Sequence, residues 1–198
     1  MQVAGKILAR TIAQRINALA DTYLSDSKNG FRRTRSTTMS ILTLRRIQEV
    51  AWDSNAPIVV AYIDIKKAFD SPPRQLILDG LRMIGCPPAL LNIVEQLHTD
   101  VRCMVQKNEE ATFTMDRGVR QGCCLGPILF IILYEILLRL AELDADDLGV
   151  ELTADSAVDG VNFPNATPAK AKFSVGTFAD DCVILATSTP PLQRALNR

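Results

Sequence analysis

The stretch Phe178-Ala179-Asp180-Asp181 places two adjacent carboxylates between two short apolar runs, residues 172–178 and 182–186. Both runs are rich in strand-forming side chains, so the pattern predicts a β-hairpin with acidic residues at its tip. Adjacent carboxylates repel each other, and a bound cation relieves that repulsion. Oxygen ligands without histidine suit Mg²⁺ better than Zn²⁺. A plain turn is the alternative, because aspartate tolerates turn geometry.

A third carboxylate follows another strand-like segment. Residues 57–63 form a continuous apolar run that ends at Asp64. Such a run predicts a central strand covered on both faces, with Asp64 at the edge where sheet proteins commonly place ligands. If the two strands are neighbours in one sheet, Asp64, Asp180 and Asp181 form an oxygen cage for two divalent ions. That arrangement performs phosphoryl transfer.

Composition excludes several other classes of protein. The chain has 198 residues, of which 47% are hydrophobic, so it can bury a real core. It has no long uncharged apolar run and no leader-like segment, so we expect neither a membrane span nor secretion. The five cysteines form no CxxC pair and His98 is the only histidine, which argues against a zinc site and a disulfide framework. We therefore expect reduced thiols in an intracellular protein.

The formal net charge of zero hides an uneven distribution of charged residues. Residues 1–50 contain nine Lys and Arg against three acidic residues, whereas residues 141–160 contain seven acidic residues and no Lys or Arg. A basic N-terminal third could contact a phosphate backbone, although a solvated basic helix face explains the same pattern. Within it, Phe31 lies among three arginines, a combination that suits a nucleic-acid strand.

Hydrophobic periodicity and turn signals predict the remaining elements. We expect helices at residues 6–20, 37–53 and 128–143, and further helices after the proline pairs at 72–73, 87–88 and 190–191. Asp70 is expected to cap the first of these proline-led helices. A hairpin is expected at residues 101–106 and 111–115, and a poorly specified connection at 144–170 with one short strand near Gly160-Val161. Residues 118–127 form a loop in which Gly122 and Gly126 would let a ligand approach the backbone.

Four segments occur in a recognisable order. They are Asn-Gly-Phe-Arg-Arg-Thr-Arg-Ser-Thr (29–37), Tyr-Ile-Asp-Ile-Lys-Lys-Ala-Phe-Asp (62–70), Gly-Val-Arg-Gln-Gly-Cys-Cys-Leu-Gly-Pro (118–127) and Phe-Ala-Asp-Asp (178–181). In this order and spacing the chain closely resembles the reverse transcriptase domain of LINE-type, non-LTR retrotransposons, a family of RNA-directed DNA polymerases. Residues 6–16 also resemble the helix that this family places before its Gly-Phe-Arg segment, so the resemblance covers nearly the whole chain.

The resemblance implies an α+β fold, the palm of a right-hand polymerase, in which an antiparallel sheet is backed by helices. Residues 1–56 would form part of the fingers, and residues 57–198 the palm, truncated after the acidic hairpin. The thumb, the upstream finger strands that clamp the triphosphate and the usual endonuclease domain would be missing. We therefore expect a fragment of a larger polyprotein, with weak or no activity when isolated.

The resemblance also implies the catalytic set. Asp64 would match the first metal-binding aspartate of the palm and Asp180 the second, and Asp181 would complete the set around two Mg²⁺ ions, which Mn²⁺ could replace. Phe69 would be the bulky aromatic that excludes a ribose 2′ hydroxyl; a core phenylalanine beneath the strand-to-helix turn is the alternative.

Further positions would bind substrate. Gln121 would lie near the templating base pair and the incoming nucleotide, in a loop shaped by Arg120 and Gly122, although turn chemistry alone explains a glycine at 122. Arg32 and Arg35 would contact template or nucleotide phosphates, with a solvated basic turn as the alternative.

The partners that the resemblance implies are an RNA template, a DNA primer and deoxynucleoside triphosphates, without a membrane, and the expected location is the nucleus. A viral RNA-dependent RNA polymerase fits less well, because Ala179 and Phe69 stand where that class usually has glycine and a second acid. Two other interpretations stay open: a group II intron maturase-like reverse transcriptase, and a truncated, catalytically inactive nucleic-acid-binding relic.

Overall fold

The computed structural model describes residues 3–99, 101–104, 112–120, 122–141, 148–154, 157–158, 161–162 and 169–197. The described helices are α1 (Val3–Tyr23), α2 (Thr37–Asp53), α3 (Arg74–Met83), α4 (Pro88–His98), α5 (Gly126–Leu140) and α6 (Thr189–Leu196). The described strands are β1 (Val59–Ile63), β2 (Arg102–Met104), β3 (Thr112–Thr114), β4 (Val150–Ala154), β5 (Ala157–Val158), β6 (Val161–Asn162), β7 (Ala169–Phe173), β8 (Val175–Phe178) and β9 (Asp181–Ala186). The mixed helical and antiparallel architecture confirms the expected α+β class.

By its contacts the chain divides into two compact units, each made of two segments. The first unit contains residues 1–26 and 65–137, and the second contains residues 27–64 and 138–198. The division into fingers (1–56) and palm (57–198) concerns functional regions and stays a prediction. The two units are described separately below.

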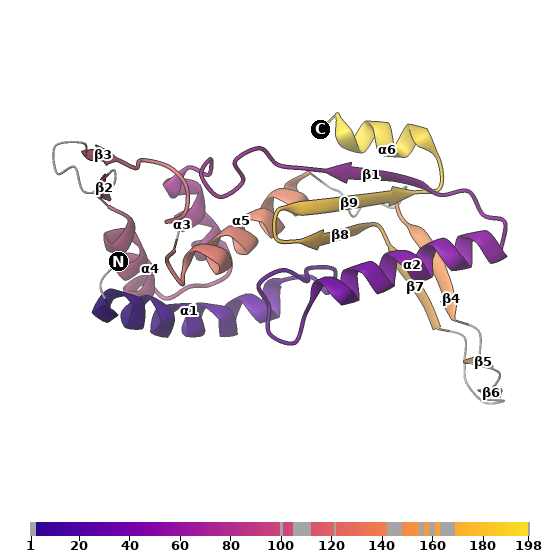
Figure 1. Ribbon diagram of the computed structural model, residues 1–198, viewed down its shortest axis with the longest axis horizontal. Coiled ribbons are helices and arrows are strands. Elements are labelled where there is room, and N and C mark those ends of the chain that lie inside the picture. The colour runs from indigo at the N-terminus through magenta and orange to yellow at the C-terminus, as the bar shows by residue number, and fades with distance from the viewer. Residues whose placement is uncertain are drawn as a thin grey trace. The chain divides into compact units, whose positions relative to one another are not determined.

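The second unit is built on a three-stranded antiparallel sheet with the strand order β1-β9-β8 (Figure 1). β8 and β9 form the predicted hairpin, with Phe178 opposite Asp181. β1 pairs along the other edge of β9. A core cluster on one face of this sheet joins it to α2 and to the β4–β7 pair; its buried members are Ile47, Val150, Val183 and Leu185.

The prediction that residues 57–63 form a central strand covered on both faces is wrong. In the described part of the sheet β1 is an edge strand, and the Tyr62 side chain is 73% exposed. Val60 is partly buried against the core cluster, and no residue of β1 is fully buried. An apolar run cannot reveal this, because aromatic and β-branched side chains fit a half-solvated strand as well as a covered one.

Residues 144–170 contain more structure than expected. β4 pairs with β7, with Val150 opposite Phe173. β5 pairs with β6, and β6 contains Val161, where only one short strand was expected. β7 has the sequence Ala-Lys-Ala-Lys-Phe, in which alanine and lysine have low strand propensity. This strand therefore depends on its pairing with β4 rather than on a local signal.

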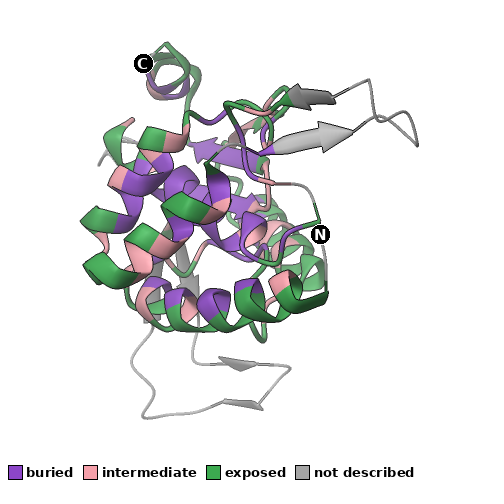
Figure 2. Cartoon of the chain, turned by 90° about the vertical axis from the view of Figure 1, so that its left-hand side faces the viewer, coloured by how far each residue is buried: buried purple, intermediate pink, exposed green. Residues whose placement is uncertain are grey.

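The first unit consists of α1, α3, α4, α5 and the β2–β3 hairpin. α5 is buried at nearly every position up to Ile136, and Gly80 of α3 packs closely against it, because an added Cβ would lie 3.1 Å from Ile136 Cδ1. The other helices bury one face and expose the opposite face (Figure 2). None of the described helices is long and apolar enough to cross a membrane.

The start of α3 differs from the expected cap. Asp70 is not the N-cap residue; Pro73 occupies that position with an extended backbone, and no side chain caps the helix. The fixed φ of proline prepares the chain for the first turn without a capping oxygen.

The core cluster predicts that shortening one of its buried side chains lowers the free energy of unfolding. Ile47 is fully buried in this cluster, so Ile47→Ala should lower the free energy of unfolding by about 2–5 kcal/mol, because it removes apolar contacts and leaves a cavity. Urea denaturation monitored by circular dichroism measures this change. The matched control on the same helix is Leu42→Ala, whose side chain is 64% exposed and whose loss should change stability by only about 0.5 kcal/mol. Equal effects of the two substitutions would contradict the assigned core.

Candidate active site

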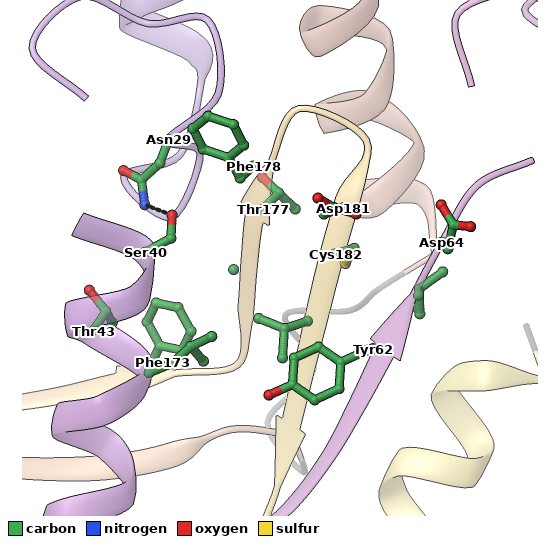
Figure 3. Close-up of a pocket in the computed structure, with 14 residues that line it drawn as sticks. Asn29, Ser40, Thr43, Tyr62, Asp64, Phe173, Thr177, Phe178, Asp181 and Cys182 are labelled. Atoms are coloured by element: carbon green, nitrogen blue, oxygen red, sulfur yellow. Dashed lines mark hydrogen bonds between the residues drawn. The ribbon is translucent and has the colours of Figure 1, made fainter. Parts of the chain in front are cut away.

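Two of the three predicted carboxylates lie at the same end of the sheet in the second unit. Ile63 of β1 lies opposite Cys182 of β9, so continuing this antiparallel register by one residue places Asp64 opposite Asp181. The two residues line one cavity, and Figure 3 shows both carboxylates at the same end of the neighbouring strands. Asp64 and Asp181 therefore lie at the same end of neighbouring strands, and their joint role as metal ligands stays a prediction.

Asp180 lies in the turn that joins β8 to β9. Ala179 and Asp180 are the two turn residues, and Ala179 has a φ of 56°, a left-handed conformation that two-residue hairpin loops require. Asp180 is half-buried, whereas Asp64 and Asp181 are exposed. Among the described residues no three His, Cys, Asp or Glu side chains form a group that could hold a metal ion. The three carboxylates thus lie on neighbouring strands and the adjoining turn, but they do not form one compact cluster.

The segment Ser27–Gly30 holds the free edge of β8. The backbone N–H of Thr177 donates to the Ser27 carbonyl at 3.1 Å, and the N–H of Asn29 donates to the Thr177 carbonyl at 3.0 Å. Gly30 then lies against the acidic turn, because an added Cβ would be 2.8 Å from Ala179 Cα and closer still to its nitrogen. Only glycine allows this approach, which explains the Gly before Phe31 in physical terms.

A cavity of about 320 Å³ lies next to Asp64 and Asp181 (Figure 3). Its wall includes Asn29 and, from α2, Ser40 and Thr43, while Phe178 and other apolar side chains of the sheet form most of the remainder. Asn29 is 9% exposed, and its Nδ2 donates to Ser40 Oγ at 2.9 Å. Its buried Oδ1 has no hydrogen-bond partner among the described residues. The sequence analysis did not predict this polar wall of Asn29, Ser40 and Thr43. The position of Asn29 directly before Gly30 is the one feature of the local sequence that could have indicated it.

Arg32 and Arg35 belong to the turn that follows Gly30. Both are half-buried rather than fully solvated, and the Arg32 guanidinium donates to the Lys28 carbonyl at 3.4 Å. The chain reverses here, with Phe31 and Thr34 at φ values of 56° and 63°. The predicted phosphate contacts of these arginines stay a prediction.

The first unit contains the other predicted substrate residues. Phe69, Arg120 and Gly122 line one open cavity of about 450 Å³. The Phe69 ring also packs on Phe130 of α5, with ring centroids 4.4 Å apart, so this side chain combines a core contact with a cavity-facing position. Gly122 has a φ of 74°, and an added Cβ would lie more than 4 Å from the other described residues apart from its chain neighbours. Gln121 lies outside the described residues.

An antiparallel sheet that carries an acidic hairpin and is combined with helices is the fold of polymerase palms, and the comparison with solved structures agrees. Apo telomerase from Candida tropicalis, truncated from its C-terminal domain, matches with a TM-score of 0.63 at 16% identity, over 98% of this chain and 36% of that one. Telomerase from Candida albicans in complex with a TWJ fragment of telomeric RNA matches with a TM-score of 0.60 at 12% identity, over 98% of this chain and 30% of that one. These likenesses establish the fold.

Residues 1–198 match the family model described as reverse transcriptase (RNA-dependent DNA polymerase), and the chain belongs to this family. It is 32% identical over 144 residues to a Pol polyprotein of the type-1 retrotransposable element R2 from Nasonia vitripennis, covering 71% of this chain and 12% of that protein. It is 22% identical over 199 residues to the transposon TX1 149 kDa protein of Xenopus laevis, covering 96% of this chain and 14% of that protein. The resemblance to non-LTR retrotransposons is confirmed, and the chain spans about an eighth of the relatives' length.

The close approach of Gly30 to the acidic turn predicts a local defect on substitution. Gly30→Ala should lower the free energy of unfolding by about 1–3 kcal/mol, because the added methyl group collides with the backbone of Ala179. In ¹H–¹⁵N spectra the amide signals of Ala179 and Asp180 should shift most.

The matched control is Gly85→Ala in the first unit. Gly85 has a φ of 78° but an open surrounding, so this variant should lose about 1 kcal/mol from backbone strain without shifting the Asp180 amide. An unchanged Asp180 amide in Gly30→Ala would show that residues 27–30 do not support the turn.

Proposed function

We propose that this chain is the palm and part of the fingers of an RNA-directed DNA polymerase, which transfers a nucleotide from a deoxynucleoside triphosphate to a primer 3′ hydroxyl on an RNA template. Family membership supports the reaction class. The observation that carries the proposal is the register that places Asp64 opposite Asp181 beside the turn that contains Asp180. The proposed place of action is the nucleus, as in the family.

The carboxylates suit the metal ions that this chemistry requires. Asp64, Asp180 and Asp181 offer only oxygen ligands, which fits Mg²⁺ or Mn²⁺ and disfavours Zn²⁺. We assign Asp64 and Asp181 as the principal holders, with Asp180 joining them from the turn. When bound, such ions lower the pKa of the attacking hydroxyl and stabilise charge on the phosphate.

The remaining roles follow from the chain's own residues. Phe69 presents its ring to a cavity together with Arg120 and Gly122, so the ring is placed to limit the space beside a sugar. The guanidinium groups of Arg32 and Arg35 follow a segment that is fixed to β8, so phosphate contacts made there would be coupled to the acidic hairpin. Gln121, between Arg120 and Gly122 in sequence, is assigned to the incoming nucleotide by the family alone.

The carboxylate pair predicts a loss of activity that leaves the fold intact. Asp64→Asn and Asp181→Asn should each reduce deoxynucleotide incorporation by a factor of about 100 or more, because each removes a negative charge that would hold the metal ions on which the reaction depends. The assay is primer extension on an RNA template with Mg²⁺, with the original protein and each variant measured side by side. Asp53→Asn is the control, since Asp53 is exposed at the end of α2, away from the sheet edge.

A second measurement does not depend on activity. Mn²⁺ should broaden the amide signals of Ile63 and Cys182 in the original protein, and much less in Asp64→Asn and Asp181→Asn. Wild-type incorporation by both variants, or broadening that persists in them, would contradict the assignment.

The position of Phe69 predicts a change in sugar selectivity. Phe69→Val should raise the ratio of ribonucleotide to deoxynucleotide incorporation by about 10- to 200-fold, because a smaller side chain leaves room for a 2′ hydroxyl. Competitive primer extension with both nucleotide types measures the ratio. Phe130→Leu is the control, because it removes the ring that packs on Phe69 while position 69 is kept. If both variants reduce stability and neither changes the ratio, Phe69 is a core residue only.

A further inference from the structure

Asn29 links three parts of the second unit. Its backbone N–H donates to the Thr177 carbonyl of β8 at 3.0 Å. Its side chain reaches in another direction, and Nδ2 donates to Ser40 Oγ of α2 at 2.9 Å (Figure 3). The next residue, Gly30, lies against the backbone of Ala179. One residue therefore connects α2, the free edge of β8 and the acidic turn.

The hydrogen bond between Asn29 and Ser40 is shielded from water. Asn29 is buried and Ser40 is half-buried, so water competes less for this bond than for one at the surface. The Thr43 hydroxyl on the same helix bonds instead to the Met39 carbonyl of α2 at 2.9 Å. Ser40 and Thr43 line the same cavity, but the Ser40 bond leaves the helix and the Thr43 bond stays within it.

α2 is attached to the sheet at two places that differ in kind. Ile47 belongs to the core cluster that also contains Val183 and Leu185 of β9. Ser40 lies seven residues earlier on the same face of the helix, about 10 Å closer to its N-terminus. Apolar packing is non-directional, so the contact at Ile47 does not by itself fix the tip of the hairpin. The hydrogen bond at Ser40 adds a directional contact near the tip.

The backbone contact with Thr177 cannot replace this attachment. Thr177 directly precedes Phe178, which pairs with Asp181 at the end of the hairpin. The contact therefore fixes residues 27–29 to the hairpin itself, and a bend of the hairpin would carry both together. A bond to α2 is what resists such a bend.

We propose that Asn29 is a positioning residue for the carboxylates at the sheet edge. Its hydrogen bond to Ser40 braces the hairpin against α2 and so keeps Asp180 and Asp181 where they can hold divalent ions together with Asp64. Asn29 acts through the turn and contacts neither the ions nor the substrate. This inference rests on the proposed function for the role of the carboxylates, and it adds that the affinity for divalent ions depends on α2.

Ser40→Ala tests the brace from the helix side. It removes the hydroxyl, and α2 should stay intact because alanine favours a helix. In ¹H–¹⁵N spectra without metal, the amide signals of Asp180 and Asp181 should shift in the same direction as in Asn29→Ala. Titration with Mn²⁺, followed by broadening of the Ile63 amide signal, should show about 10-fold weaker binding in each variant.

A double variant separates one shared interaction from two independent defects. If both side chains act through one bond, combining Asn29→Ala with Ser40→Ala should weaken Mn²⁺ binding no more than either change alone. Ser40→Thr keeps a hydroxyl and should keep the affinity of the original protein. Thr43→Val is the matched control: it removes a hydroxyl that lines the same cavity but bonds within α2, so it should change neither the amide shifts nor the affinity.

Two results would overturn this inference alone. One is a Ser40→Ala protein with unshifted Asp180 and Asp181 signals and unchanged Mn²⁺ affinity, and the other is additive losses in the double variant. If Asn29→Ala does not fold, Ser40→Ala and Ser40→Thr decide. Failure of the proposed function looks different: no broadening of the Ile63 signal in the original protein would exclude the metal site itself, and this inference with it.

Discussion

The antiparallel pairing of β1 with β9 is the constraint on which the candidate active site depends. Side chains alternate along a strand, so a slip of one residue would move Asp64 to the opposite face of the sheet. The register is fixed away from the carboxylates, where Val60 pairs with Leu185 on the face that packs against Ile47. The hydrophobic core of the second unit therefore specifies which carboxylates meet at the sheet edge.

The other edge of the hairpin is fixed by a different kind of contact. Residues 27–30 bond to Thr177 through the backbone, and Gly30 touches the acidic turn without an intervening side chain. The basic turn with Arg32 and Arg35 follows at once, so its position depends on the same hairpin that carries Asp180 and Asp181. A resemblance based on separate motifs does not reveal this coupling, because residues 27–30 and 177–180 are far apart in the chain.

Much of this arrangement follows from local sequence signals, and the exceptions have physical reasons. The periodicity of residues 37–53 matches α2, and the two apolar runs around Asp180 match β8 and β9, because both patterns are set by which residues face the core. The exposure of Tyr62 and the pairing of β7 with β4 depend on contacts with segments distant in the chain, which the local sequence pattern does not reveal. The same holds for Asn29, whose side chain meets Ser40 only after the chain has turned.

The boundary between the two units falls within one short motif, residues 62–70. Residues 62–70 read as a single motif, yet Asp64 belongs to the second unit and Phe69 to the first. The strand pairing of β1 determines the position of Asp64, whereas packing on Phe130 determines the position of Phe69. A substitution in one unit can therefore alter carboxylate geometry without altering the Phe69 cavity, and the reverse also holds. Two positions that are five residues apart in the sequence are thus each fixed by a separate core.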